Sequence, residues 1–297
     1  MRSNGKVLVT IIGAPEIWQI DPVTSTGELI YTFPTGEYYG NCTLGITEYS
    51  PDIFAIVAGN FDIPSVSGVE GSWAIWSLDL YHGYGDVNMI TDIPPAVFLN
   101  GLTSLPADAD GHFLLVADSY LGLIYRVDVV EGTWTTFLDD PSLKRNTSAA
   151  IQIGVNGIRY FDDYLYFDNS GQAPMFARVP VSGDLTADGS VQVVAAAATF
   201  PVNAKYYGYD DFTFDQYGDA WLATNPSRSI VKIEVDSGAV QVVEAGGLND
   251  ETVRSCTSVQ FGRGDDSYTL YVTANVIGQG GKLLMVDSLG ELGVRSL

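Results

Sequence analysis

Asparagine and aspartate side chains recur at matched positions along the chain and are the first candidates for chemistry. One set stands where a repeated β-rich segment begins: Asn100, Asn156 and Asp210, with Leu44 and Thr257 in the corresponding places. A second set closes the following strand: Asn60, Asp118, Asn169, Asn225 and Asn275, with Ile11 in the first segment. Such residues also end strands by bonding their own backbone, which explains part of the second set. The recurrence in the first set favours a shared polar site.

Carboxylate and amide oxygens that converge from several segments are the ligands that Ca²⁺ and Mg²⁺ prefer. Three such groups with one charge would hold a cation weakly without a further carboxylate. The sequence therefore predicts no required cofactor and leaves a Ca²⁺ or Mg²⁺ ion open as an alternative.

Two tyrosine-rich segments precede two of these positions. They are Glu37-Tyr38-Tyr39-Gly40 and Lys205-Tyr206-Tyr207-Gly208. Tyrosines there would line an apolar pocket with hydroxyl donors at its rim, or would pack over the fold without a ligand. Lys205 could polarise a ligand carbonyl, although a solvated or ion-paired lysine is the commoner arrangement.

The chain has 2 histidines, His82 and His112, and both are expected on the face opposite the candidate site. Neither would then serve as a general base there, and no G-x-S-x-G motif is present. Hydrolysis by a Ser-His-Asp or Cys-His arrangement is therefore disfavoured.

The elements that position these residues come from a repeat. An apolar run ends in Asp in five units, at Asp21, Asp79, Asp128, Asp236 and Asp287, and a sixth unit lies around Arg178. Each unit reads as four short strands with Gly, Asp or Asn turns. Six such units predict one all-β domain over residues 1–297, a six-bladed β-propeller with four-stranded antiparallel blades. A β-sandwich or two unrelated β domains is the alternative.

The first unit is expected to be incomplete. Its strand KVLVTII aligns with HFLLVAD, the second strand of a later unit, so the innermost strand of the first blade is predicted to be missing. We expect either removal of residues from a longer precursor or an internal start. The closing segment ELGVRSL is predicted to add an outer strand to the sixth blade.

Charge excludes several classes of partner. The 297 residues hold 36 acidic and 14 basic side chains, for a net charge of -22. A nucleic-acid binder needs clustered Lys and Arg, so this class is improbable, and anionic membrane surfaces are disfavoured for the same reason. No apolar run reaches the length of a membrane span. The expected partners are small molecules, and the oligomeric state stays open.

Two cysteines and two sequons bear on the compartment. Cys42 and Cys256 precede the innermost strands of the blades that flank the incomplete one, so a disulfide could tie the ring there; two free buried thiols are the alternative. The sequons begin at Asn41 and Asn146 and agree with a secretory or extracellular protein. Because residues 1–5 lack an apolar signal region, we expect the signal segment to be absent from this chain.

Four segments carry a resemblance to a known family. LNGLTSLP, LLVADSYLGLIYRVD, GVNGIRYFDDYLYFDNSG and DDFTFDQYGDAWLATNP resemble the regucalcin–gluconolactonase family of six-bladed propellers, and they look closest to its fungal, secreted branch. The resemblance implies a divalent cation on the channel axis, held by a Glu, two Asn and an Asp. Asn156 and Asp210 match two of these ligands, and Asn100 matches an Asn on the substrate side. The Glu falls in the missing strand.

Some fungal proteins similar to this branch are hetero-Diels–Alderases, which join a tropolone ortho-quinone methide to a sesquiterpene alkene. The resemblance and the aromatic segments together imply such an enzyme, with a metal-dependent lactonase or a non-catalytic binding propeller as alternatives. The predicted catalytic residues are Lys205, Tyr206, Asn156 and Asp210. The predicted substrate-binding residues are Tyr38, Tyr39, Asn60, Asn100, Asp118, Asn169, Tyr207, Asn225 and Asn275.

Overall fold

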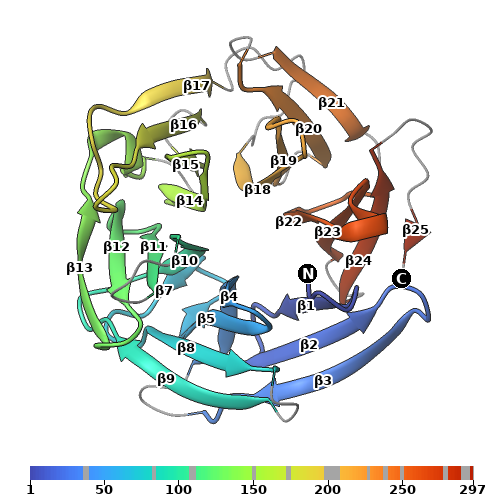
Figure 1. Cartoon of the computed structure of the whole chain (residues 1–297), viewed down its shortest axis with the longest axis horizontal. Helices are drawn as coiled ribbons and strands as arrows, with labels where there is room; N and C mark the ends of the chain where they lie inside the picture. Colours follow the sequence, from blue (N-terminus) through green and yellow to red (C-terminus); the bar gives the residue numbers. More distant parts are fainter. Residues whose placement is uncertain are drawn as a thin grey trace.

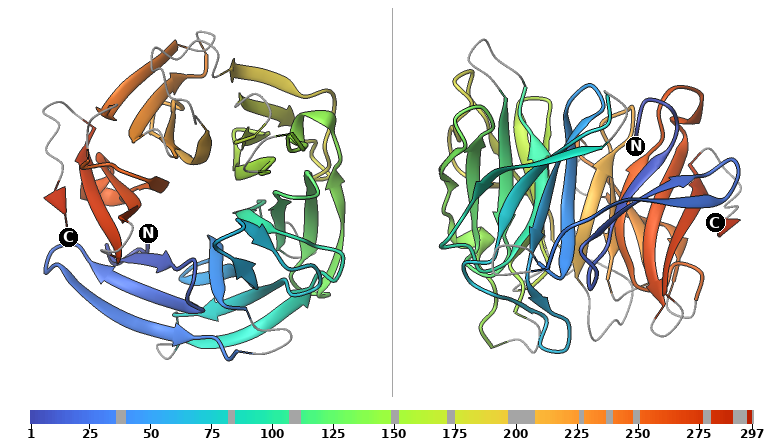
Figure 2. Two further views of the ribbon diagram at one scale, coloured as in Figure 1. Left: turned by 180° about the vertical axis from the view of Figure 1, so that it is seen from behind. Right: turned by 90° about the horizontal axis from the view of Figure 1, so that it is seen from below.

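The computed structural model places six antiparallel sheets side by side around a central channel (Figure 1). Seen from the side, the strands run along the channel axis (Figure 2). The structure describes residues 1–35, 40–81, 85–106, 112–148, 152–171, 175–196, 208–225, 228–236, 240–247, 251–276, 280–288 and 295–296. The predicted six-bladed β-propeller is thereby confirmed.

In each blade the first strand lies nearest the channel and the last lies outermost (Figure 1). Blade 1 consists of β1 (Val7–Thr10), β2 (Glu16–Asp21) and β3 (Thr26–Thr32). Blade 2 consists of β4 (Cys42–Ser50), β5 (Ile53–Gly59), β8 (Ala74–Asp79) and β9 (Asp86–Asp92), with a small hairpin of β6 (Phe61–Asp62) and β7 (Ser67–Gly68). Blade 3 consists of β10 (Leu99–Ser104), β11 (Phe113–Asp118), β12 (Leu123–Asp128) and β13 (Thr133–Leu138).

The second half of the ring follows the same order. Blade 4 consists of β14 (Val155–Phe161), β15 (Tyr164–Asn169), β16 (Met175–Pro180) and β17 (Gln192–Ala196). Blade 5 consists of β18 (Tyr209–Phe214), β19 (Ala220–Thr224), β20 (Ser229–Glu234) and β21 (Val240–Gly246). Blade 6 consists of β22 (Cys256–Phe261), β23 (Thr269–Val276), β24 (Gly280–Asp287) and β25 (Arg295–Ser296). Short 3₁₀ turns lie at Pro141–Leu143 and Gly264–Asp266, and no helix among the described residues could cross a membrane.

Blade 1 has three strands, as predicted, and β25 completes the outer edge of blade 6, also as predicted. An ion pair spans the place of the missing strand: Arg263, which follows β22, lies 2.5 Å from Glu48 of β4. The backbone of Ile11 also exchanges hydrogen bonds with Thr43 of β4. Blades 6 and 2 are thus connected directly where blade 1 lacks its innermost strand.

The repeated Asp that revealed the blades has a structural role. The Asp128 carboxylate accepts hydrogen bonds of 2.9 Å from the backbone N–H groups of Val130 and Glu131. Asp21 makes the same kind of contacts with Val23 and Thr24. These side chains therefore shape the turn between the third and fourth strands of a blade.

Glycines near the start of the innermost strands reflect the close approach of neighbouring blades. A Cβ atom on Gly101 would lie 2.2 Å from the carbonyl oxygen of Asn156, and one on Gly45 would lie 2.2 Å from that of Asn100. Only glycine fits at these positions, because the backbones of adjacent innermost strands meet there.

Candidate functional site

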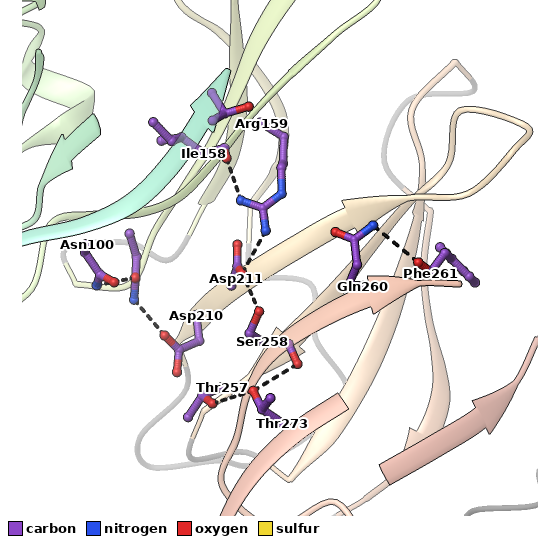
Figure 3. A network of polar contacts seen from close by, with 12 residues as sticks. Asn100, Ile158, Arg159, Asp210, Asp211, Thr257, Ser258, Gln260, Phe261 and Thr273 are labelled. Atoms are coloured by element: carbon purple, nitrogen blue, oxygen red, sulfur yellow. Dashed lines mark hydrogen bonds and ion pairs between the residues drawn. The ribbon is translucent and has the colours of Figure 1, made fainter. Parts of the chain in front are cut away.

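Four polar side chains from three blades form one hydrogen-bonded network at the end of the channel. Figure 3 shows the part of it that runs from Asn100 to Asp210. The amide nitrogen of Asn100 donates to Asn156 Oδ1 at 2.5 Å. The amide nitrogen of Asn156 donates to Asp210 Oδ1 at 2.9 Å, and that of Asn225 donates to Asp210 Oδ2 at 3.0 Å. The Asp210 carboxyl thus anchors two amides, and one of them orients a third.

A bulge near the start of the innermost strand places these residues. The pairing register shifts between Leu99 and Leu102 in β10, between Val155 and Ile158 in β14, and between Tyr209 and Phe212 in β18. The residues inside the three bulges are Asn100-Gly101, Asn156-Gly157 and Asp210-Asp211. A bulge re-aims its side chains out of the regular alternation. The same irregularity in three successive blades therefore presents Asn100, Asn156 and Asp210 to one another.

Ser170 supports the network from blade 4. The Asn156 amide nitrogen also donates to Ser170 Oγ at 2.9 Å, and that hydroxyl donates to the carbonyl of Tyr209 at 2.5 Å. Both amide hydrogens of Asn156 are committed as a result. Ser170 was not among the predicted site residues, although it directly follows Asn169 at the end of a second strand, where other predicted site residues lie.

Burial sets the electrostatics of Asp210. It raises the pKa of this carboxyl from 3.8 to about 7, and neighbouring Asp211 acts in the same direction, while the amide donors Asn225 and Asn156 oppose the shift. Asp210 therefore passes between its neutral and charged forms near neutral pH.

A second polar layer lies beside the network. The Arg159 guanidinium is 3.0 Å from Asp211 Oδ2, and the Ser258 hydroxyl donates to the same oxygen at 2.6 Å (Figure 3). Asp168, from β15, is fully buried; no described side chain bonds its oxygens, and the backbone N–H of Gly157 is the donor that lies nearby. Burial, followed by the charges of Asp211 and Asp210, holds the pKa of Asp168 well above its usual range.

The donor set offers little to a divalent cation. Asp210 is the one carboxylate of the network, and amide N–H groups occupy both of its oxygens, while Asn156 Oδ1 already accepts from Asn100. No group of three His, Cys, Asp or Glu side chains within the described residues could hold a metal. A cation would have to displace these hydrogen bonds and would gain only one carboxylate ligand. The residues present therefore do not fit a divalent metal.

The other residues predicted from the second strands lie apart from this network. Asp118 is fully buried and accepts hydrogen bonds from the backbone N–H groups of Val97, Phe98, Tyr120 and Leu121. Asn169 donates to the carbonyls of Ser142 and Lys144. Both residues fasten loops to the strand ends. Asn60 is half-buried and Asn275 is exposed, and neither joins the four-residue network.

Several predicted residues lie outside the described part of the chain: Tyr38, Tyr39, Lys205, Tyr206, Tyr207 and His82. His112 lies at the start of β11, while Asp118 ends this strand on the side of the network. The His112 ring packs edge-on against Tyr49, with ring centroids 5.5 Å apart. The opposite-face position predicted for His112 agrees with this geometry.

Of the two alternatives for Cys42 and Cys256, the disulfide is wrong and the pair of free buried thiols is what the structure shows. Cys42 and Cys256 are free and buried in separate blades. Cys42 Sγ lies 3.2 Å from the carbonyl of Gly59, and Cys256 Sγ lies 3.4 Å from that of Ser229, so each thiol is held inside its own region. Burial raises the pKa of both thiols to about 12.

The two sequon asparagines lie in different surroundings. Asn41 is exposed and bonds the backbone of Phe61 through both its amide nitrogen and its oxygen. Asn146 is half-buried, and its oxygen accepts from the Ser148 backbone.

No family model matches this chain, and no curated protein is similar to it in sequence. Solved structures are similar in shape. The luciferin-regenerating enzyme has a TM-score of 0.66 at 14% identity, covering 100% of this chain and 92% of its own. A calcium-binding regucalcin from Agrobacterium tumefaciens has a TM-score of 0.63 at 15% identity, covering 98% and 87%. The propeller fold is shared with both.

Another similar structure comes from a nidogen/laminin complex, with a TM-score of 0.65 at 13% identity over 94% of this chain and 89% of the other. The shared fold therefore occurs both in an enzyme and in a structure solved as a protein complex. At such identities the likeness defines the fold alone, and function has to be argued from the site.

Proposed function

We propose that this propeller is an enzyme of fungal secondary metabolism that promotes an intermolecular hetero-Diels–Alder cycloaddition. Its substrates would be a tropolone ortho-quinone methide and a sesquiterpene alkene. The observation that carries the proposal is the anchoring of the Asn156 and Asn225 amides by the Asp210 carboxyl. Such a network offers fixed hydrogen-bond donors without a nucleophile or a histidine base.

The reaction needs little more than donors and positioning. One C–C bond forms between the methide carbon and the alkene, and one C–O bond forms between the carbonyl oxygen and the other alkene carbon. The alkene π bond and the exocyclic C=C and C=O π bonds of the methide are consumed, and the remaining electron pair becomes a new π bond in the tropolone ring. No proton or leaving group departs. Because the methide draws electrons from the alkene, negative charge develops on the carbonyl oxygen. Donors aimed at that oxygen lower the barrier, and holding both partners in contact removes much of the entropic cost.

The available donors are Asn100 and Asn225. Each uses one amide hydrogen in a hydrogen bond to a described residue, so a second hydrogen is left for a ligand. Lys205 is proposed as a further donor, and the four tyrosines at 38, 39, 206 and 207 as the aromatic wall. The proposal includes no required cofactor, and it includes a secretory location.

A metal-dependent lactonase is the second candidate. The observation in its favour is that Asn156 and Asp210, the two matched ligands of the regucalcin–gluconolactonase family, meet at 2.9 Å. Hydrolysis of this kind requires a cation to polarise the lactone carbonyl and activate water. The network has a single carboxylate and so offers little to hold that cation, which favours the cycloaddition.

The test is direct incubation with a quinone-methide precursor and a humulene-type alkene, followed by chiral product analysis. We expect faster formation and one dominant stereoisomer relative to buffer, in the presence of EDTA as well as in its absence. Asn88→Ala, on exposed β9, is the matched control for substitutions of Asn100 and Asn225. Products and rates identical to those in buffer would exclude the cycloaddition. Lactone hydrolysis that depends on Ca²⁺ or Mg²⁺ would support the lactonase instead.

A further inference from the structure

A stacked pair, Arg145 and Tyr120, lies between blades 3 and 4 on the side of the polar network. The Arg145 guanidinium carbon is 3.5 Å from the centroid of the Tyr120 ring. Tyr120 follows β11, whereas Arg145 belongs to the loop that leads into β14. That loop is fastened to its neighbour, because the Gly154 N–H donates to the Ser119 carbonyl at 2.7 Å. A Cβ on Gly154 would lie 2.9 Å from the backbone nitrogen of Arg145, and Gly154 is two residues before Asn156, so the Arg145 backbone lies beside the segment that carries the network.

Arg145 has no carboxylate partner among the described residues. The two acids of its own loop are engaged elsewhere: Asp139 pairs with Lys144, and Asp140 accepts from Ser142 at the start of a 3₁₀ turn. The hydrogen bond of Arg145 to a described side chain is to the uncharged Gln152.

Carboxylates are abundant in this chain, with 36 acidic and 14 basic side chains, and Arg2, Arg159 and Arg263 each pair with one. Arg126 and Arg178 also stack on aromatic rings without an ion pair among the described residues, so Arg145 differs from them in its place beside the polar network. An arginine left unpaired beside a polar site has donors for a ligand, since a guanidinium carries five N–H groups in a planar fork. Tyr120 covers one face of that plane and fixes its orientation. The edge and the second face are then suited to a flat group with anionic oxygens.

We propose that Arg145, stacked on Tyr120, binds a planar aromatic or quinonoid molecule through an acidic oxygen of that molecule, a carboxylate or an enolate. The net charge of -22 disfavours anions at the whole surface, so binding of this anion depends on its direct contacts with Arg145. The inference goes beyond the proposed function and does not depend on it, because it concerns binding and requires no cycloaddition.

Benzoate is the probe, and benzyl alcohol is its uncharged counterpart. Affinity for each is measured by NMR titration of the whole protein at neutral pH. We expect the wild type to bind benzoate more tightly than benzyl alcohol. Arg145→Ala is expected to weaken benzoate binding about tenfold or more and to leave benzyl alcohol unchanged, because one charge-assisted contact is lost. Lys144→Ala removes the same charge from the adjacent residue and should leave benzoate affinity unchanged.

Two further variants separate recognition from simple attraction and from misfolding. Arg145→Lys keeps the charge but lacks the planar fork, so it should lose most of the benzoate affinity. Tyr120→Phe keeps the aromatic ring and should retain the benzoate affinity. Thermal melting of each variant shows whether a loss of affinity comes from unfolding instead. Equal benzoate binding by Arg145→Ala and wild type, equal losses in Arg145→Ala and Lys144→Ala, or no preference for benzoate would overturn the proposal. None of these outcomes bears on the cycloaddition assay.

Discussion

The amide nitrogen of Asn156 lies 2.9 Å from the carboxylate of Asp210, so a hydrogen bond joins the innermost strands of two neighbouring blades. Asp210 accepts a second amide from Asn225 of its own blade, and Asn156 accepts one from Asn100 of the preceding blade. The middle pair thus determines where the outer amides point. Substitutions within this network should therefore have unequal effects.

Asn156→Ala should impair the proposed reaction more than Asn100→Ala or Asn225→Ala. It leaves Asn100 without its acceptor and Asp210 without one of its donors, whereas each of the other changes removes a single peripheral amide. We expect a fall in kcat/KM of about 100-fold for Asn156→Ala and about tenfold for each of the others, in line with the loss of fixed donors. Equal effects of all three, or an effect of Asn88→Ala, would contradict this hierarchy.

The stability of the fold should depend on pH through Asp210. Burial raises the pKa of its carboxyl from 3.8 to about 7, so the folded state holds a proton that the unfolded chain releases. The stabilisation is fully present below pH 3.8 and is lost as the pH rises to about 7. Relative to Asp210→Asn, the wild type should therefore lose on the order of 2–4 kcal/mol over that interval. Urea unfolding of both proteins at several pH values, with EDTA present, measures the difference, and parallel pH profiles would contradict it.

The fold was predictable because its signal is repeated. Each unit carries turn residues and alternating strands, and even the three-stranded blade 1 followed from aligning Val7–Thr10 with a second strand. The gathering of Asn100, Asn156 and Asp210 also followed, because equivalent positions of a propeller face one channel. Their contact depends on bulges and on Gly101 and Gly157, which permit close approach of the strands. The sequence shows these glycines but not the resulting distances.

Other features could not be predicted, because one residue type serves two purposes. The sequence aligns Asp118 with Asn225, but in the structure Asp118 pairs with Leu99 where blade 5 pairs Thr224 with Tyr209, so Asn225 stands one residue further along. Asp118 is bound by four backbone N–H groups, while Asn225 reaches Asp210. The disulfide was predicted wrongly for a similar reason. Cys42 and Cys256 occupy similar positions in the two blades that flank blade 1, but this does not bring their thiols together. Long-range partners such as Tyr120 and Arg145 leave no trace in local pattern at all.

Reductant should not change the stability of the protein. The thiols of Cys42 and Cys256 are free and buried, so there is no covalent tie across blade 1 to break. Melting temperatures with and without dithiothreitol should agree within about 1 °C, because the removal of a native disulfide costs several kcal/mol and would shift melting by far more. Intact-mass measurement after alkylation should show two modified thiols once the protein is unfolded. A mass that indicates no reactive thiol before reduction would contradict the structure.

Asp168→Ala should stabilise the protein. Asp168 pairs with Phe176 across β15 and β16, and the corresponding positions of blades 3 and 5 are the fully buried Ala117 and Ala223. No described side chain bonds the Asp168 oxygens, and the nearby backbone N–H of Gly157 is a weak donor to them at best. A fully buried carboxyl with so little compensation is costly, so its removal should raise the free energy of unfolding by about 1–3 kcal/mol.

The gain from Asp168→Ala should also grow with pH. Burial and the nearby charges of Asp211 and Asp210 raise the pKa of Asp168, while Arg159 opposes the shift. The wild type therefore loses stability as the pH rises from the ordinary range of a carboxyl toward that raised pKa, and the alanine variant does not. Urea unfolding at pH 5 and pH 8 tests this, with exposed Asp188→Ala of the same blade as the control. A variant less stable than the wild type at both pH values would mean that the Asp168 carboxyl makes a stabilising contact that compensates for its burial.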